Sequence, residues 1–381
     1  MVSLLAAALI AAVPAAAARP PLQVVSPLPR FLAPGAPLVV RGWTGRALPV
    51  RLLLGGRTVD ASTSGRLGGF KLRVRAPRPG RYAVEVTAPG ERRRVGTLLV
   101  RPLVLAAAGD VNLGDAVAAA IASHGPRYPW LQVAPVLRGA DLATANLECA
   151  VSSRGLPVAN KAFTFRGPPT ALAAAADFAG LDVLSLANNH SLDYGRSAFF
   201  DTLALVRAAG IAAVGGGRNL AAARRPAILP GGGLRLAFLG YSDINPPGFA
   251  AGPSWPGTAA ADSAAIAADV RAARRRADMV VVWFHWGIEL DRYPDGRQQE
   301  LGAAALNAGA TVVLGSHPHV LQPIVRPARG RLVAWSLGNF VFAPHSPGTD
   351  RTGVLLISLD AAGVRGHVFR PARIVGVQPR F

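Results

Sequence analysis

The sequence predicts two domains: a small all-β sandwich of immunoglobulin-like type over residues 19–101, and a larger α/β domain over residues 102–381. Up to Val100, short apolar or alternating runs are separated by Gly, Pro and Ser clusters about every ten residues, which is typical of a sandwich. From Pro102 onward, apolar runs of strand length alternate with Ala-rich helical stretches, which indicates an α/β domain. A chain of 381 residues is long enough to bury both cores.

The expected elements follow in order along the chain. In the first domain the strands are "PLVVRGW", "VRLLLGG", "FKLRVRA", "RYAVEVTA" and "RVGTLLV". In the second domain, strands are expected over residues 103–110, 181–190, 278–287 and 310–319, and helices over 115–125, 197–210, 263–277 and 296–309. The tail "GVLLISLDAAGVRGHVF" alternates about a Gly turn, which predicts a terminal hairpin.

The first 18 residues are apolar and then rich in small side chains, with an A-x-A cleavage pattern near Ala18. This pattern predicts a signal peptide over residues 1–18 and an exported protein of the cell envelope. The segment lacks Lys and Arg before its apolar run, so an uncleaved anchor or a mis-assigned start remains an alternative. The single cysteine, Cys149, excludes an intrachain disulfide framework.

The formal net charge is +20, and residues 19–101 hold 16 Arg or Lys against three acids. Two interpretations stay open: an arginine-rich composition without further meaning, or docking of the first domain on a polyanion such as anionic lipid or an envelope polymer. We expect no nucleic-acid partner, because the chain has no basic helix or aromatic stacking motif and carries an export signal.

Polar clusters end the predicted strands of the α/β domain. Four of the seven histidines are in these clusters, while His124, His345 and His367 are not, and we interpret those three as surface or structural residues. The carboxyl ends of strands in an open α/β sheet meet at one crevice. The clustered residues are Asp110, Asn112, Asn146, Glu148, Asn188, Asn189, His190, His285, His317 and His319.

These residue types suit a transition metal. Carboxylate and amide oxygens with neutral imidazoles are the ligand set of Mn, Fe or Zn sites. About seven ligands exceed what one tetrahedral ion needs, so we expect two divalent ions about 3.5–4 Å apart, bridged by a carboxylate and a water. Pro318 between two histidines restricts the backbone, so that the two rings can point to different ions.

Six motifs in order resemble one known family, the bacterial capsule-synthesis CapA family. They are "GDVNLGD", "ANLECAV", "LSLANNHSLDYG", "VVVWFHWGIEL", "GATVVLGSHPHVLQP" and "AWSLGNFVF", between about Leu103 and Phe342. The family includes poly-γ-glutamate synthesis accessory proteins and belongs to the calcineurin-like metallophosphoesterase superfamily. The resemblance implies a two-sheet α/β sandwich of metallophosphoesterase type, with a dinuclear metal site at the sheet edge, and it does not extend to the β-sandwich.

The resemblance also implies a role for each matching residue. Asp110 and His319 would bind the first metal, and Glu148 would bridge both. Asn189, His285 and His317 would bind the second metal. His190 would protonate the leaving group or stabilise developing charge.

Three departures from the superfamily pattern accompany this assignment. Asn112 stands where the superfamily has a histidine, Glu148 where it has an aspartate, and Ser316 where it has a glycine. The first two changes are shared by CapA-like proteins and suggest one weaker metal position. Full phosphoesterase activity therefore does not follow from the superfamily alone.

Further residues near the motifs are candidates for substrate contact or for packing. Lys161 and Arg166 either hold an anionic substrate group or lie on a solvated loop. Asp193 is expected to orient His190. Glu289 is expected to face the substrate rather than cap a helix, and Asn339 either closes the rim or forms a turn. Asn112 and Asn146 complete the predicted substrate-binding set, while Trp283, Trp286 and Trp335 are expected to pack in the core and at the rim.

Two functions from different classes follow. The first is an exported, metal-dependent hydrolase acting on an envelope polymer, such as capsule or poly-γ-glutamate, or on a phosphoester. The second is a non-catalytic accessory subunit of a membrane-bound polymer synthesis or export complex, whose site binds anionic polymer. A purely structural adhesion module would require the clustering of histidines to be coincidence.

Overall fold

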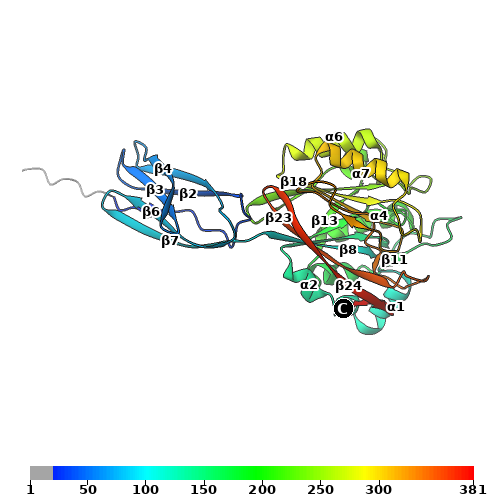
Figure 1. The fold of residues 1–381 in the computed structure, drawn as a ribbon. Helices are drawn as coiled ribbons and strands as arrows, with labels where there is room; N and C mark the ends of the chain where they lie inside the picture. The colour runs from blue at the N-terminus through cyan, green and yellow to red at the C-terminus, as the bar shows by residue number, and fades with distance from the viewer. Residues whose placement is uncertain (1–19) are drawn as a thin grey trace, which may run out of the picture. The chain divides into compact units, whose positions relative to one another are not determined.

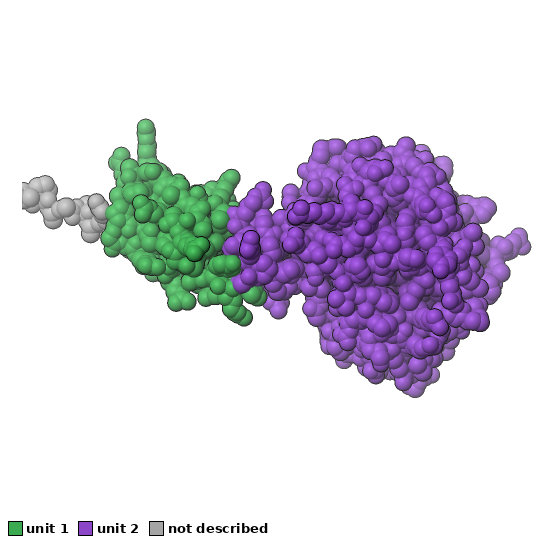
Figure 2. Space-filling view, viewed as in Figure 1, with its two compact units in different colours: residues 1–28, 38–74, 81–99 green, residues 29–37, 75–80, 100–381 purple. Residues whose placement is uncertain are grey.

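The computed structural model describes residues 20–381, so the predicted signal segment lies outside the described residues. The chain divides into two compact units (Figure 2). The first comprises the described residues up to Leu28, with Leu38–Val74 and Arg81–Leu99. The second comprises Pro29–Pro37, Arg75–Gly80 and Val100–Phe381.

The first unit is built from strands alone, in two sheets. The three-stranded sheet has the order β1-β2-β5, with β1 at Gln23–Val24, β2 at Pro37–Trp43 and β5 at Gly69–Arg75. The four-stranded sheet has the order β4-β3-β6-β7, with β4 at Arg57–Thr63, β3 at Pro49–Leu54, β6 at Gly80–Ala88 and β7 at Glu91–Val100. The immunoglobulin-like class of this unit stays a prediction.

All five predicted strands of this unit are present, and the structure adds β1 and β4, neither of which the sequence predicted. Strand β4 lies at the edge of its sheet, and its residues "RTVDAST" are exposed or half-buried throughout. An edge strand without a buried face needs no apolar alternation, so its sequence carries no strand signal.

The second unit is mixed α/β with two large sheets. The eight-stranded sheet has the order β13-β12-β9-β8-β23-β24-β25, with β22 also paired to β8. Its strands are β8 Leu103–Val111, β9 Leu142–Leu147, β12 Val183–Ser185, β13 Ala212–Val214, β22 Asn339–Val341, β23 Arg351–Asp360, β24 Gly363–Val375 and β25 Gln378–Arg380. Strands β8, β9 and β12 run parallel, so their carboxyl ends reach the same edge.

The six-stranded sheet has the order β15-β16-β18-β19-β21-β20. Its strands are β15 Ala227–Gly231, β16 Leu234–Ser242, β18 Met279–His285, β19 Val312–Ser316, β20 Ile324–Val325 and β21 Leu332–Ala334. Strands β16, β18 and β19 are parallel. Strand β18 is buried along its whole length, which explains its unbroken apolar run "MVVVWF".

Helices cover the outer faces of the two sheets (Figure 1). Helices α1 at Asp115–His124, α2 at Ala134–Gly139, α3 at Ala171–Asp177 and α4 at Gly195–Ala208 pack with β8, β9 and β12 in one apolar cluster. Helices α6 at Ser263–Arg274 and α7 at Gly296–Ala308 pack on β16, β18 and β19 in another, together with the short α5 at Leu220–Ala223. None of the helices in residues 20–381 is both long and apolar enough to span a bilayer.

The two sheets meet through side chains on their inner faces. Trp283 of β18 is fully buried, and its indole Nε1–H donates to Thr144 Oγ1 of β9 at 2.9 Å. Trp286 is also fully buried, but it packs in the apolar cluster with α6 and α7, where it donates to the carbonyl oxygen of Trp335 at 2.9 Å. The packing roles predicted for these tryptophans are confirmed.

The predicted tail hairpin exists, but it is not peripheral. Strand β23 pairs antiparallel with β8 and so extends the eight-stranded sheet next to its central strand. Strand β16, which the sequence analysis did not predict, lies inside the six-stranded sheet between β15 and β18. Both placements depend on pairing between segments that are far apart in the chain.

Candidate metal centre

The polar clusters converge where the two sheets present the carboxyl ends of their parallel strands. Asp110 lies at the end of β8, Glu148 follows β9, and Asn189 follows β12 in the first sheet. His285 ends β18, and His317 and His319 follow β19 in the second sheet. All except the partly buried Asn189 are at most 6% exposed. The structure therefore brings all six predicted metal ligands together.

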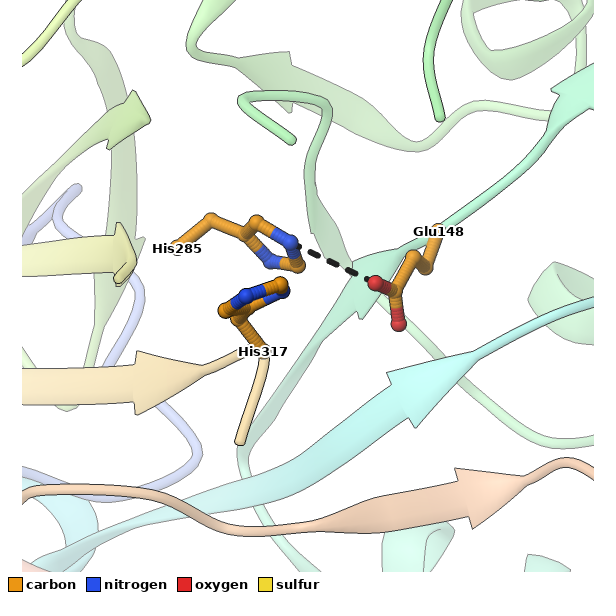
Figure 3. A group of neighbouring side chains, drawn as sticks. All are labelled: Glu148, His285 and His317. Atoms are coloured by element: carbon orange, nitrogen blue, oxygen red, sulfur yellow. Dashed lines mark ion pairs between the residues drawn. The ribbon is translucent and has the colours of Figure 1, made fainter. Parts of the chain in front are cut away.

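Three overlapping groups of these side chains could each hold an ion. Glu148, His285 and His317 form one group (Figure 3), and Asp110, Glu148 and His319 form another. Within each group one ligand atom per residue lies within 4.8 Å of the others. A third group joins His317 and His319 to the exposed Glu289. Glu148 belongs to the two fully buried groups, so its carboxylate stands between them.

The histidine rings are held by neighbours that set their protonation. Ser316 Oγ donates to the Phe284 carbonyl at 3.1 Å and also lies 3.1 Å from His285 Nδ1, and Asn146 Nδ2 lies 3.4 Å from the same nitrogen. With the ring proton on Nδ1, His285 Nε2 is unprotonated, and it faces Asn189 Oδ1 at 2.8 Å and Glu148 Oε1 at 3.3 Å. Three lone-pair atoms directed at one another are the arrangement that a cation stabilises.

His319 is held in the same way. Asn339 donates its amide Nδ2 to the Thr349 carbonyl at 3.3 Å, so its Oδ1 accepts from His319 Nδ1–H at 2.8 Å. The second ring nitrogen, Nε2, is left free as a ligand. Asn339 is fully buried, so it orients the candidate ligand His319 and does not close the rim of the site. Closing the rim was one of its two predicted roles.

Unpaired polar atoms at the centre fit a metal. Glu148 is fully buried, and neither carboxylate oxygen has a hydrogen-bond partner. The buried His317 Nδ1 also has none. Buried polar groups are otherwise almost always paired, and an unpaired carboxylate among imidazoles is explained by an ion that it would coordinate. The residues present therefore fit divalent metal binding.

Asp110 is fixed by two donors from different strands. Asn146 Nδ2 donates to Oδ1 at 2.8 Å, and the His317 backbone N–H donates to Oδ2 at 3.2 Å. Asn146 is in turn held by Asn188 Nδ2, which donates to its Oδ1 at 3.1 Å. Asn146 and Asn188 are completely buried, so Asn146 positions Asp110, and a direct contact with substrate, as predicted, is not supported.

The backbone around the paired histidines is strained. His317 has φ 95° and His319 has φ 59°, values that side chains with a Cβ rarely adopt and that carry a penalty of about 1–3 kcal/mol each. Their rings are 5.9 Å apart at an angle of 53°. The unusual backbone on both sides of Pro318 thus allows the two imidazoles to enter different ligand groups.

Burial controls the charges of the centre. It raises the pKa of Asp110 to about 7 and, with the neighbouring Asp110 carboxylate, it raises the pKa of Glu148 well above its usual value. Burial lowers the pKa of His317 to about 3 and that of His319 to about 4, and lowers the pKa of His285 well below its ordinary value. At neutral pH the imidazoles are neutral, which is the form that binds metals.

His190 and Asp193 form the predicted pair beside this centre. His190 Nδ1 lies 2.6 Å from Asp193 Oδ2, which also accepts from the Phe165 backbone N–H at 2.7 Å. Lys161 Nζ pairs with the other Asp193 oxygen and donates to the Asn189 carbonyl at 2.7 Å. Lys161 is thereby engaged within the site. Burial lowers the pKa of His190, an effect that Asp193 opposes and the Lys161 charge assists.

The structure places some of the remaining predicted residues at one pocket and leaves another outside it. Asn112 and Glu289 line a pocket that also contains His190 and His319. Arg166 does not reach this pocket: its guanidinium lies 4.2 Å from the centre of the Tyr194 ring and donates to the Gly155 carbonyl at 3.3 Å. Arg166 instead lines a separate pocket of about 490 Å³ together with Ser152 and Pro168, and its substrate role stays a prediction.

Some functional neighbours were missed by sequence reasoning. His345 is exposed as expected of a surface residue, yet it borders the same pocket, with its ring 5.1 Å from that of His319. Phe165 stacks on His190 at 4.2 Å. Asn188 was seen as part of a cluster but was given no role. The motif "SLGNFVF" precedes His345 by only a few residues and was the one available signal.

Comparison with known proteins places the chain in a family. The family described as "Bacterial capsule synthesis protein PGA_cap" matches residues 104–344, which is most of the second unit. The fold and the site thus define the chain as a protein of the bacterial capsule synthesis family. The chain is a member of the PGA_cap family, as the six motifs indicated.

Characterised relatives agree with this assignment. The PGA biosynthesis protein CapA of Bacillus subtilis is 34% identical over 236 residues, covering 61% of this chain and 62% of that protein. The capsule biosynthesis protein CapA of Bacillus anthracis is 32% identical over 247 residues, covering 63% and 60%. A probable polyglutamine synthesis accessory protein of Mycobacterium tuberculosis is 31% identical over 228 residues, covering 56% and 60%. The matched region spans about three fifths of each relative's length.

Solved structures are more distant. A 5′-nucleotidase precursor from Thermus thermophilus aligns with 73% of this chain and 56% of its own at 14% identity and a TM-score of 0.41. The NAD nucleotidase of Haemophilus influenzae aligns with 71% and 50% at 10% identity and a TM-score of 0.40. TM-scores below 0.5 do not establish a common fold.

Proposed function

We propose that this protein is an exported, metal-dependent hydrolase of bacterial envelope polymer metabolism, with a metallophosphoesterase-type centre of two divalent ions. The observation that carries the proposal is Glu148, a buried carboxylate with both oxygens unpaired, surrounded by three neutral buried imidazoles. Membership of the PGA_cap family supports a role in capsule or poly-γ-glutamate metabolism. The names of the relatives support the same role.

The sharing of ligands supports two ions. Glu148 belongs both to the group with His285 and His317 and to the group with Asp110 and His319. One carboxylate common to two groups is the arrangement of a bridged pair. Nitrogen and oxygen ligands without a cysteine suit Mn, Fe or Zn. Two such ions would lower the pKa of water and would stabilise negative charge at an attacked phosphorus or carbonyl centre.

His190 is the residue of this chain that would accept a proton and then donate it during hydrolysis. The side chain of His190 is 7% exposed and lines the pocket beside the metal groups. With Nδ1–H donated to Asp193, its Nε2 can take up a proton, and the Asp193 carboxylate stabilises the resulting imidazolium. Lys161 limits that stabilisation because it shares the same carboxylate. The lowered pKa of His190 means that it acts first as a proton acceptor and afterwards as the donor to a leaving group.

Metal content is the first test. Protein purified without a His tag is measured by mass spectrometry beside an Asp110→Ala, His319→Ala double variant and a His367→Ala control, whose histidine lies on β24 outside the candidate ligand groups. We expect about two transition-metal ions per chain in the wild type and the control. We expect a loss of metal in the double variant. Equal metal content in all three proteins would refute the site.

Turnover is the second test. Metal-loaded protein is supplied with p-nitrophenyl phosphate, bis-p-nitrophenyl phosphate and poly-γ-glutamate, with Mn, Fe or Zn in turn. Release of nitrophenol or shortening of the polymer, lost in the double variant, is the expected result. A protein that binds its metals but releases no product would refute hydrolysis and favour the second candidate function.

That second function is an accessory subunit of a membrane-bound polymer synthesis complex, which binds anionic polymer without chemistry. The observation that favours it is the positive charge of residues 19–101, which contain 16 Arg or Lys and only three Asp or Glu. The Mycobacterium relatives are also named as accessory proteins. Retention of poly-γ-glutamate by the protein in low salt and release in high salt would support this function. A reporter fused after residue 30 tests export directly.

A further inference from the structure

A pocket of about 280 Å³ lies beside the metal groups, and His190 and His319 are among its lining residues. One wall is a continuous set of aromatic rings. Phe165 stacks on His190 at 4.2 Å, and Phe342 meets Phe165 edge-on at 5.8 Å and His319 at 5.4 Å. Phe163 borders the same pocket. The wall is therefore a fixed surface of ring faces and edges that leads away from the reacting centre.

The charge of this pocket is opposite to that of the chain. The protein holds 41 Arg or Lys against 21 Asp or Glu. Yet the ionisable side chains that line the pocket, apart from histidines, are Asp115 and Glu289, and it has no Arg or Lys among its described lining residues. The nearest cation of the site, Lys161, is engaged with Asp193 and the Asn189 carbonyl. Without a bound metal, the fixed charges of the lining are therefore negative, and they favour a cation over an anion.

Two further features indicate that the pocket receives a ligand. Phe163 is 70% exposed at its border, so its ring face is accessible to a ligand. The almost buried His190 has its Nδ1 2.6 Å from Asp193 Oδ2 and 3.0 Å from Lys161 Nζ, and its Nε2 has no hydrogen-bond partner among the described residues. A molecule in the pocket can therefore cover the Phe163 ring and reach the Nε2 atom of His190.

We propose that this pocket binds an apolar group that carries an ammonium, and that substrates of the enzyme present such a group next to the bond that is broken. Ring faces attract cations and bury apolar groups, and the two carboxylates supply the opposite charge. In the metal-free protein, a carboxylate or phosphate in the same place would meet Asp115 and Glu289 without a Lys or Arg among the lining residues. The catalytic meaning of this inference rests on the proposed function, whereas the binding itself does not.

The experiment uses the full chain freed of metal with EDTA, so that neither bound ions nor turnover contribute. The probes are benzylamine, which is an ammonium ion at neutral pH, neutral benzyl alcohol and anionic phenylacetate. Their dissociation constants are measured by ligand-observed NMR in low salt. We expect benzylamine to bind about tenfold more tightly than benzyl alcohol, and phenylacetate to bind most weakly.

Two variants with exposed side chains test the assignment. Glu289→Gln is expected to weaken benzylamine several-fold and to leave benzyl alcohol unchanged, while Phe163→Ala is expected to weaken both. Glu300→Gln on α7 and Phe200→Ala on α4 are matched controls, because these exposed residues do not line the pocket. They are expected to bind the probes as the wild type does.

The proposal is overturned if phenylacetate binds as tightly as benzylamine, or if Glu289→Gln and Phe163→Ala bind all probes as the wild type does. These outcomes leave the metal content and hydrolysis tests untouched. A protein without hydrolase activity that still selects benzylamine would refute the proposed function alone, so the two failures can be told apart.

Discussion

Replacing Glu148 with Gln should have opposite effects on stability without and with metal. In the metal-free protein the carboxyl is fully buried, its oxygens are unpaired, and Asp110 lies close enough to raise its pKa. A Gln of the same shape cannot ionise, and its amide can donate to Asp110. Because burial raises the pKa of Glu148, its ionisation at neutral pH favours the unfolded state, and a buried unpaired polar group destabilises a fold by about 1–3 kcal/mol. We therefore expect Glu148→Gln to raise the metal-free free energy of unfolding by about 1–3 kcal/mol.

With metal the order should reverse. A ligand at about 100 times its dissociation constant stabilises the native state by about 2.7 kcal/mol. The wild type gains this amount, whereas Glu148→Gln has lost the one carboxylate that two ligand groups share and should gain little. Each of these two free-energy changes is large enough to reverse which protein, the wild type or Glu148→Gln, has the larger free energy of unfolding.

Urea unfolding followed by tryptophan fluorescence measures both states, in EDTA and in excess Mn²⁺ or Zn²⁺. Five of the six tryptophans lie in the second unit, so the signal reports mainly on the unit that holds the centre. Glu300→Gln, which removes an exposed carboxylate on α7 with its surface contacts to Ser263 and Arg297, is the matched control and should change stability by less than about 1 kcal/mol. The reasoning is refuted if Glu148→Gln destabilises the metal-free protein, or if metal stabilises the variant as much as the wild type.

Three further outcomes are expected. Asn339→Ala removes the acceptor that orients a candidate histidine ligand, so isothermal titration should show metal affinity about 10–100-fold weaker; unchanged affinity would contradict the assigned role. Metal affinity should rise with pH through about 7, because burial raises the pKa of Asp110 to about 7 and also raises the pKa of Glu148, and both protons must leave before a cation binds. Titration at about pH 6 in buffers of different ionisation enthalpy should therefore show between about one and about two protons released, and absence of release would refute the argument. Trp283→Phe leaves Thr144 Oγ1 without its indole donor between the sheets, so urea unfolding should show a loss of about 1–3 kcal/mol, and a change below about 0.5 kcal/mol would show that this bond contributes little.

The sequence by itself determined the residue types of the centre and the elements that present them. Buried parallel strands such as β18 have to be continuous apolar runs, and the residue after such a run lies at a sheet edge, so His285 and Glu148 could be found without coordinates. It did not reveal β4 or β16. An exposed edge strand has no apolar period, and a short apolar run does not distinguish a strand from a helix.

Only the tertiary structure decided which partners the centre has. Asn339 holds His319, Ser316 holds His285, and Lys161 is joined to Asp193, while Arg166 lies away from the pocket. These relations depend on the register between strands and on loops that meet from distant parts of the chain, and no local pattern encodes them. The aromatic pocket with its two carboxylates arises in the same way, because Phe163, Glu289 and Phe342 come from three separate loops and strand ends. Local periodicity is written in neighbouring residues, whereas a site assembled across two sheets exists only after the sheets have packed.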